Sequence, residues 1–212
     1  MFKLSSKYYY LRHENEIKRF LNSNSNWVHI INSDSSYKNF TGSKENLFLV
    51  DLDLNLKNQF INIEDQRFDL IVITDIFEVT DDIYDLLNSL NKLLKNNGKI
   101  LINSINTKWN FFLLFFEFFK IKKISRPRSY IHLKKIYSIS ESSGFEIVRS
   151  YTRQIFPFKL FGFGNFLNNI LEILFFKFNL GINNYLLLSK TGKVEKVHSK
   201  TIIVPAKNEE LN

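Results

Sequence analysis

The sequence predicts an α/β fold with a mostly parallel sheet, because short apolar runs alternate with amphipathic stretches along its 212 residues. The clearest predicted strand is residues 68–74 (FDLIVIT), an apolar and β-branched run. Leucine and isoleucine then recur at helical spacing from Ile83 to Leu94, and a second apolar run follows at residues 99–104 (KILINS). Strand, helix and strand in this order form a right-handed crossover, the building unit of a parallel sheet.

The ends of the crossover helix carry matching signals. Asp81 and Asp82 place carboxylates at its positive end, and Gly98 is expected to stop it. The same reasoning predicts the other elements: helices at 14–21, 131–142 (closed by Gly144) and about 166–178, and strands at 27–31, 47–52, 145–150 and 184–189.

Composition excludes several classes of protein. With 44% hydrophobic residues the chain can bury a core, and without cysteine it has no disulfide, thiolate zinc site or thiol nucleophile. The four histidines lack a paired spacing, so no metal site is predicted. The N-terminus shows no apolar signal region, and charged or amide residues interrupt the apolar stretches at 111–119 and 155–180. We therefore expect a cytoplasmic protein without a transmembrane helix.

Positive charge is concentrated in the second half of the chain. Residues 1–106 hold 12 basic and 14 acidic residues, and residues 107–212 hold 17 and 7, so the second half has a net charge of +10. Such a surface can meet phosphate groups on a nucleic acid, a lipid headgroup or a substrate, or it can be a solvated face. A nucleic-acid partner is not expected, because no recognition motif or stacking platform accompanies the charge.

Residues 67–106 (RFDLIVITDIFEVTDDIYDLLNSLNKLLKNNGKILINSIN) resemble the second half of class I S-adenosylmethionine-dependent methyltransferases, of the methyltransferase type 11 kind. Residues 129–150, with their "GF" strand, are similar to the late part of that family. The resemblance implies a Rossmann-like sheet with helices on both faces, a late antiparallel strand and S-adenosylmethionine as cofactor.

In that family a glycine-rich loop after the first strand approaches the methionine part of the cofactor. The corresponding residues 28–36 (VHIINSDSS) contain no glycine, and Asn32 and Asp34 take the cofactor-binding positions. Because a Cβ in a tight turn costs energy or displaces the ligand, the degenerate loop predicts weak cofactor binding or none. Micromolar or tighter affinity for the cofactor or its demethylated product would contradict this prediction.

The resemblance places a ribose-binding acid at the end of the second strand. Asp51 occupies that position, with Asp53 as the second choice. Asp75, just past the strand at 68–74, is expected at the mouth of the site, since open α/β sheets bind ligands at the carboxyl ends of their strands. The alternative, that Asp34, Asp51 and Asp75 only cap turns, remains open.

Only 16 residues separate Asp51 from Phe68, where the family has a helix, a third strand and a loop. We expect the helix to be missing and residues 61–65 to be the remnant of that strand. Glu64 or Asp65 would then take the place of the acid on the adenine side.

No general base is evident. Asp75 and His132 are the candidates worth testing, although a lone histidine on a helix is usually structural.

Residues 201–210 (TIIVPAKNEE) look like the opening strand of a family-two glycosyltransferase. The predicted organisation is a methyltransferase-like domain at 1–190, a linker at 191–200 and the truncated start of a glycosyltransferase-like domain at 201–212. The alternative is a chance strand and tail.

Two functions follow. The chain resembles bacterial fusions of a methyltransferase with a glycosyltransferase, which implies methyl transfer to cell-envelope glycans or their lipid carriers. The alternative is a non-catalytic module that scaffolds, or recruits substrate for, a fused or adjacent glycosyltransferase.

Two phenylalanine-rich segments, residues 110–120 and 155–180, are expected to form a helical cap. In the second, Asn165, Asn168, Asn169 and Glu172 form a polar face opposite Phe166, Ile170, Leu171 and Leu174. Either the two helices bury each other, or part of the apolar surface stays exposed and contacts the inner face of the membrane or a polyprenyl phosphate, helped by the basic residues at 120–128.

Overall fold

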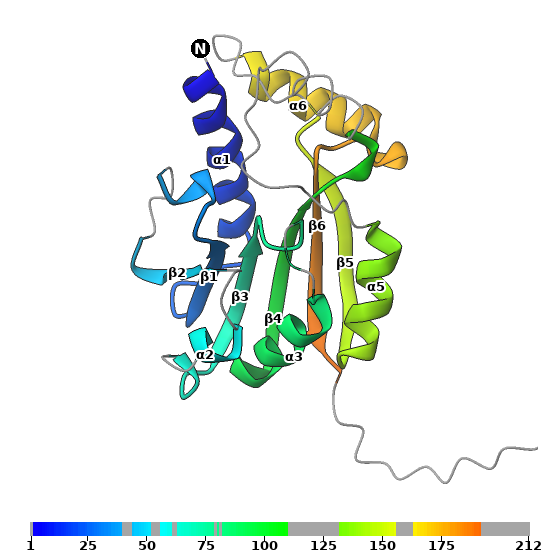
Figure 1. Cartoon of the computed structure of the whole chain (residues 1–212). Coiled ribbons are helices and arrows are strands. Elements are labelled where there is room, and N and C mark those ends of the chain that lie inside the picture. Colours follow the sequence, from blue (N-terminus) through cyan, green and yellow to red (C-terminus); the bar gives the residue numbers. More distant parts are fainter. Residues whose placement is uncertain are drawn as a thin grey trace, which may run out of the picture.

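A computed structural model describes residues 2–39, 44–51, 56–60, 63–78, 80, 82–109, 132–155 and 163–191. Its centre is a six-stranded sheet in the order β2-β1-β3-β4-β6-β5 (Figure 1). Strands β1 to β4 run parallel, and β6 pairs antiparallel with β4 and with β5. The predicted fold class, a mostly parallel α/β sheet with a late antiparallel strand, is confirmed.

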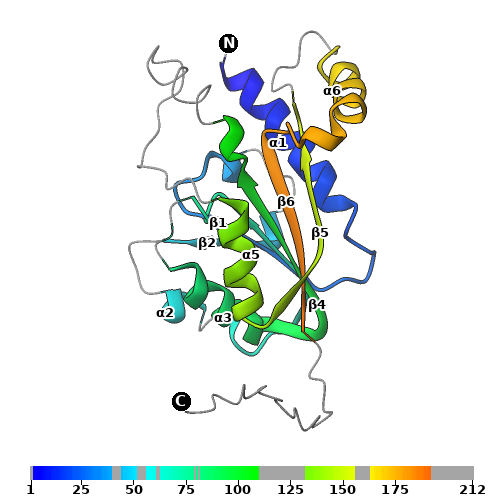
Figure 2. The ribbon, with the colours of Figure 1, turned by 90° about the vertical axis from the view of Figure 1, so that its right-hand side faces the viewer.

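The strands are β1 (Trp27–Asn32), β2 (Leu47–Val50), β3 (Phe68–Thr74), β4 (Leu94–Ile105), β5 (Phe145–Arg153) and β6 (Asn183–Lys190). The described α-helices are α1 (Phe2–Lys18), α2 (Leu56–Phe60), α3 (Ile83–Leu93), α5 (Leu133–Ser142) and α6 (Phe163–Leu174). Figure 2 shows helices on both faces of the sheet, with α1 on one side and α2, α3 and α5 on the other.

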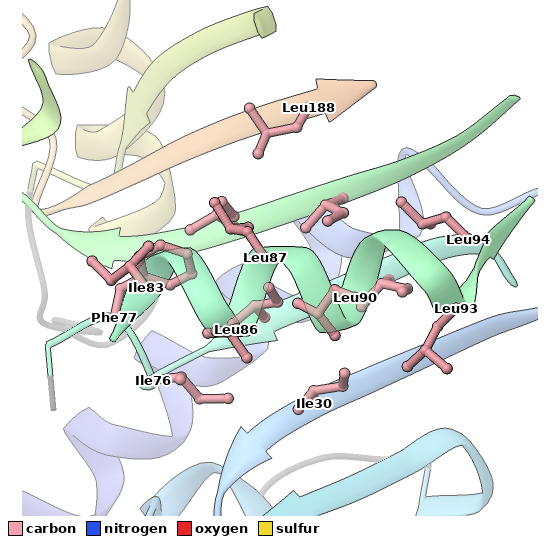
Figure 3. Packing of buried hydrophobic residues seen from close by; sticks show 14 of the residues in the cluster. Ile30, Ile76, Phe77, Ile83, Leu86, Leu87, Leu90, Leu93, Leu94 and Leu188 are labelled. Atoms are coloured by element: carbon pink, nitrogen blue, oxygen red, sulfur yellow. The ribbon is translucent and has the colours of Figure 1, made fainter. Parts of the chain in front are cut away.

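One face of the sheet is an apolar core under α3. The helix buries five of the six residues whose spacing predicted it, namely Ile83, Leu86, Leu87, Leu90 and Leu93 (Figure 3). The sixth, Leu94, is buried as the first residue of β4. These side chains pack on alternate residues of the strands, such as Ile30 and Leu188. The part of the predicted acidic start that falls on Asp82 is also confirmed, because its carboxylate accepts a hydrogen bond from the Asp85 amide at 2.8 Å, whereas Asp81 lies outside the described residues.

The role predicted for Gly98 is wrong. Strand β4 begins at Leu94, directly after α3, so Gly98 lies inside a strand and does not stop the helix. A Cβ at this position would come 2.8 Å from the Phe68 carbonyl oxygen. Glycine is therefore required by the close approach of two strands, not by a turn.

Two other boundaries also differ from the prediction. Helix α1 begins at Phe2 rather than Glu14, because polar and aromatic residues build its buried side. The helix thought to be missing after the second strand is present as α2, and residues 63–65 form a turn instead of a third-strand remnant.

The second face of the sheet lies under α1. Ile17 packs there on Leu70, Val72 and Leu101, in a smaller apolar cluster that Tyr185 joins. Helix α6 lies beside α1 above the ends of β4, β6 and β5 (Figure 1). The predicted helix at 110–120 and the glycosyltransferase-like strand at 201–210 fall outside the described residues. Among the described helices, none has the length and apolar content that crossing a bilayer requires.

Candidate functional site

The carboxyl ends of β1, β2 and β3 meet at one edge of the sheet. The Ser33 amide, just past β1, donates to the Val50 carbonyl oxygen at the end of β2 (2.8 Å). The Ser35 hydroxyl donates to the carboxylate of Asp75, the residue after β3, at 2.5 Å. The structure therefore brings the loop that holds Asn32 and Asp34 together with Asp75.

The loop after β1 is closed by its own side chains. The Asn32 carbonyl oxygen accepts from the Ser35 amide at 2.8 Å, and its side-chain oxygen accepts from the Asp34 amide at 3.1 Å. A short 3-10 helix, Ser36–Asn39, follows. No residue of this loop has a positive φ. The loop therefore shows no backbone strain from its missing glycines. Weak cofactor affinity remains a prediction, but backbone strain does not support it.

The left-handed conformation occurs at Asp75 instead, with φ of 58°. Aspartate tolerates this region better than most residues, and the bond from Ser35 holds its carboxylate toward the loop. The conformation turns the chain sharply at the end of β3, so that Asp75 stays at the strand edge.

Asp51 is held by α2. The Gln59 side chain accepts from the Asp51 amide and donates to the Asp51 carbonyl oxygen, both at 2.7 Å. This pair of bonds fixes the backbone after β2 and leaves the half-buried Asp51 at the same edge as Asn32 and Asp75. The short helix that sequence reasoning missed therefore positions one of the predicted site residues.

The structure does not bring Glu64 to this edge. Glu64 and Asp65 are exposed in the turn before the amino end of β3, opposite the end where Asp75 lies. Because parallel strands all start at the same edge, a residue just before a strand cannot join residues that follow the others. Asp53 lies outside the described residues.

A buried polar cluster lies directly behind Asp75, between α1 and the sheet. The Thr74 hydroxyl contacts Nε2 of His13 and Nε2 of His29, each at 2.8 Å. Nδ1 of His13 contacts the Tyr185 hydroxyl at 2.8 Å. Tyr37, from the loop after β1, packs on both imidazoles, with ring centroids 5.4 and 4.8 Å away.

The hydrogen bonds of this cluster can all be made with both histidines neutral. Tyr185 can donate to His13, His13 to Thr74, and Thr74 to His29, which uses each proton once. Burial lowers the pKa of His13 from 6.5 to about 4, opposed by the Asp75 carboxylate. Burial, and then repulsion from His13, hold the pKa of His29 well below its usual value. Burial raises the pKa of Tyr185 well above its usual value.

Sequence reasoning missed this cluster, although one signal was present. Tyr9, His13 and Glu16 are spaced at i, i+4 and i+7, which puts them on one helix face. All three make hydrogen bonds to the strands in the structure: Tyr9 to Asn183, His13 to Thr74 and Glu16 to Tyr151.

His132 is exposed immediately before α5, and its side chain makes no hydrogen bond to the helix start. No group of three or more histidine, aspartate or glutamate side chains is arranged to hold a metal ion within the described part of the chain.

A charged cleft of about 620 Å³ opens between α1, the end of β5 and α6. It is lined by Arg12, Glu16, Arg19, Arg153, Asn169, Glu172 and Ile173. Glu172 pairs with Arg12 at 3.0 Å and with Arg153 at 3.1 Å, and Glu16 pairs with Arg19 at 3.0 Å. The lining carries one more positive than negative charge.

No protein-family model matches the sequence, and no curated protein is detectably similar to it. Solved structures do match. A methyltransferase from Thermotoga maritima, described as S-adenosylmethionine-dependent and a possible histamine N-methyltransferase, aligns with a TM-score of 0.57 at 15% identity, over 88% of this chain and 92% of its own. An S-adenosylmethionine-dependent methyltransferase from Archaeoglobus fulgidus aligns with a TM-score of 0.52 at 17% identity, over 85% and 92%.

The fold is that of the S-adenosylmethionine-dependent methyltransferases. A third such enzyme, from Mesorhizobium loti, covers 83% of this chain and 96% of its own at 10% identity, with a TM-score of 0.51. On this methyltransferase fold, the edge formed by Asn32, Asp51 and Asp75 is where an open α/β sheet binds its ligand.

Proposed function

We propose that the protein is an S-adenosylmethionine-dependent methyltransferase. The observation that carries the proposal is the bond between Ser35 and Asp75, which joins the loop after β1 to the end of β3 at the ligand-binding edge of a methyltransferase fold.

The side chains at this edge fit the charge of the cofactor. S-Adenosylmethionine carries a cationic ammonium and a cationic sulfonium, and its ribose hydroxyls are hydrogen-bond donors. Asp34, Asp51 and Asp75 provide carboxylates at three neighbouring positions. Opposite charges at short range stabilise each other most where water is partly excluded.

Each residue has a specific part in binding. Asp51, fixed by Gln59, would accept hydrogen bonds from the ribose hydroxyls. Asp75 and Asn32 would face the methionine part, and Tyr37, in the loop between them and α1, is buried against His13 and His29. The bound cofactor supplies an electrophilic methyl group. The chain's contribution would be to hold the acceptor atom in line, and the proton that the acceptor loses would pass to water or to Asp75, the candidate base at this edge.

For the acceptor we propose a cell-envelope glycan or its lipid carrier. The cleft beside α6 supports this choice, because its three arginines exceed by one charge the two glutamates that pair with them, and guanidinium groups suit the phosphate of a lipid carrier. The resemblance of residues 201–210 to the start of a family-two glycosyltransferase also supports it. A downstream or adjacent glycosyltransferase would be the partner.

Calorimetric titration with S-adenosylhomocysteine tests cofactor binding. We expect a dissociation constant weaker than micromolar, and a further loss of about tenfold or more in Asp51→Ala, since a lost acceptor costs about 1–3 kcal/mol. Glu64→Ala is the matched control, because that carboxylate lies at the other end of the sheet.

Equal effects of the two substitutions would contradict the assignment of Asp51. Absence of binding in every variant would favour the second function, a non-catalytic module that recruits substrate for a glycosyltransferase.

A further inference from the structure

Helix α6 packs with its polar side chains Asn168 and Glu172 toward the rest of the protein. Asn168 is fully buried and donates to the Tyr8 hydroxyl at 3.1 Å, and Asn165 accepts from Tyr8 and from Arg12, both at 3.1 Å. Glu172 binds Arg12, Arg153 and the Gln154 amide. The side chains of Asn165, Asn168 and Glu172 therefore point toward α1 or the end of β5.

The apolar side of the helix consequently faces outward. Phe166 is 60% exposed, Ile173 78% and Leu174 65%. The same segment adds further exposed apolar residues, Phe163, Ile170, Phe175 and Phe178. We call these seven side chains the α6 apolar face. Several exposed apolar side chains on one helix face indicate an interaction site, because each Å² of apolar surface left in water forfeits about 25 cal/mol.

The charges beside this face are positive. Lys177 is exposed in the short 3-10 helix Phe176–Phe178, and the exposed Lys108 extends to the Phe178 carbonyl oxygen at 2.6 Å. The acid of this segment, Glu172, is turned inward and paired. An apolar face that is bordered by lysines, and whose glutamate is turned inward, complements an anionic bilayer better than it complements a second copy of this chain.

We propose that the α6 apolar face docks on the surface of an anionic membrane. The helix lies in the interface, its phenylalanine and aliphatic side chains enter the headgroup and acyl boundary, and Lys108 and Lys177 contact the lipid phosphates. This docking is independent of cofactor binding. It would bring the arginine-lined cleft, which shares Glu172 and Ile173 with α6, close to the lipid surface.

Vesicle flotation tests the proposal on the full chain. We compare vesicles of phosphatidylcholine alone with vesicles that also contain phosphatidylglycerol, each at low and high salt. We expect the chain to bind the anionic vesicles, and we expect high salt to weaken this binding. The double variant Phe166→Ser, Ile173→Ser should reduce it at least tenfold. Tyr84→Ser, an exposed aromatic on α3, is the matched control and should bind like the parent chain.

Lys177→Gln separates the electrostatic part and should weaken anionic binding about fivefold. Thermal unfolding of each variant verifies the fold, which these exposed positions should not disturb. Absence of any preference for anionic vesicles would overturn the proposal. So would a dimer in sedimentation that Phe166→Ser and Ile173→Ser dissociate, since the occupant would then be a second copy. Calorimetric titration with S-adenosylhomocysteine tests cofactor binding, and so the proposed function, independently of membrane binding.

Discussion

The two faces of the sheet come from the same strands but differ in chemistry, because the α1 face adds a buried polar cluster to its smaller apolar one. Toward α3, β1 and β3 present Ile30, Ile71 and Ile73, and the layer between helix and sheet is almost wholly apolar. Toward α1, the same strands present His29 and Thr74, and the Thr74 hydroxyl bonds both to His29 and to His13 of the helix. Apolar packing depends on volume, whereas the α1 face depends on every donor meeting an acceptor. The two faces should therefore fail under different conditions.

Removing volume from the α3 face should have the largest effect. Leu90 is fully buried at the centre of α3, so Leu90→Ala loses both buried area and packing and should cost about 2–5 kcal/mol of unfolding free energy. Urea denaturation near neutral pH measures this. Leu11→Ala, at an exposed position on α1, serves as the control and should change the free energy far less. A cost below that of the control would show that the α3 face is not the main core.

Acid should break the α1 face and spare the α3 face. The folded chain holds the pKa of His13 at about 4 against 6.5 unfolded, so between these values the unfolded state binds more protons. Stability should be complete above pH 6.5 and fall as pH decreases toward about 4. The loss from His13 alone is about 3 kcal/mol, at about 1.4 kcal/mol per pKa unit.

Urea denaturation of the parent chain, His13→Gln and His132→Gln between pH 4 and 6.5 measures how the unfolding free energy changes with pH. The His13→Gln curve should be flatter with pH, and His132→Gln should follow the parent chain because that side chain is exposed. Identical slopes in all three proteins would place the acid sensitivity elsewhere.

Thr74→Val gives the smallest expected change and isolates the hydrogen bonds of the α1 face. The shape is kept, but the Nε2 atoms of His13 and His29 lose their shared partner, at a cost of about 1–3 kcal/mol. Val72→Thr, which adds a hydroxyl to the same face of the same strand, is the converse test. An unchanged midpoint for Thr74→Val would mean that the hydroxyl contributes no net stability.

Much of the fold was predictable where the signal is local. Residues 68–74 form β3 with the predicted bounds, and the buried side of α3 follows directly from its spacing, because one element carries the whole pattern. The role of Gly98 was not predictable, since it depends on Phe68 of a neighbouring strand. Nor was the start of α1, because the buried residues described before Ile17 are Tyr8, His13 and Glu16, which show no apolar period.

At the site, the resemblance to methyltransferases predicted Asn32, Asp34 and Asp51, and the rule that open α/β sheets bind ligands at the carboxyl ends of their strands predicted Asp75. Only the tertiary structure decided that Ser35 bonds Asp75, that Gln59 holds Asp51 and that Glu64 lies at the opposite end. It also decided which side of α6 faces outward. Helical spacing defines two faces of a helix, but the partners across the interface, here Tyr8, Arg12 and Arg153, determine which face is buried.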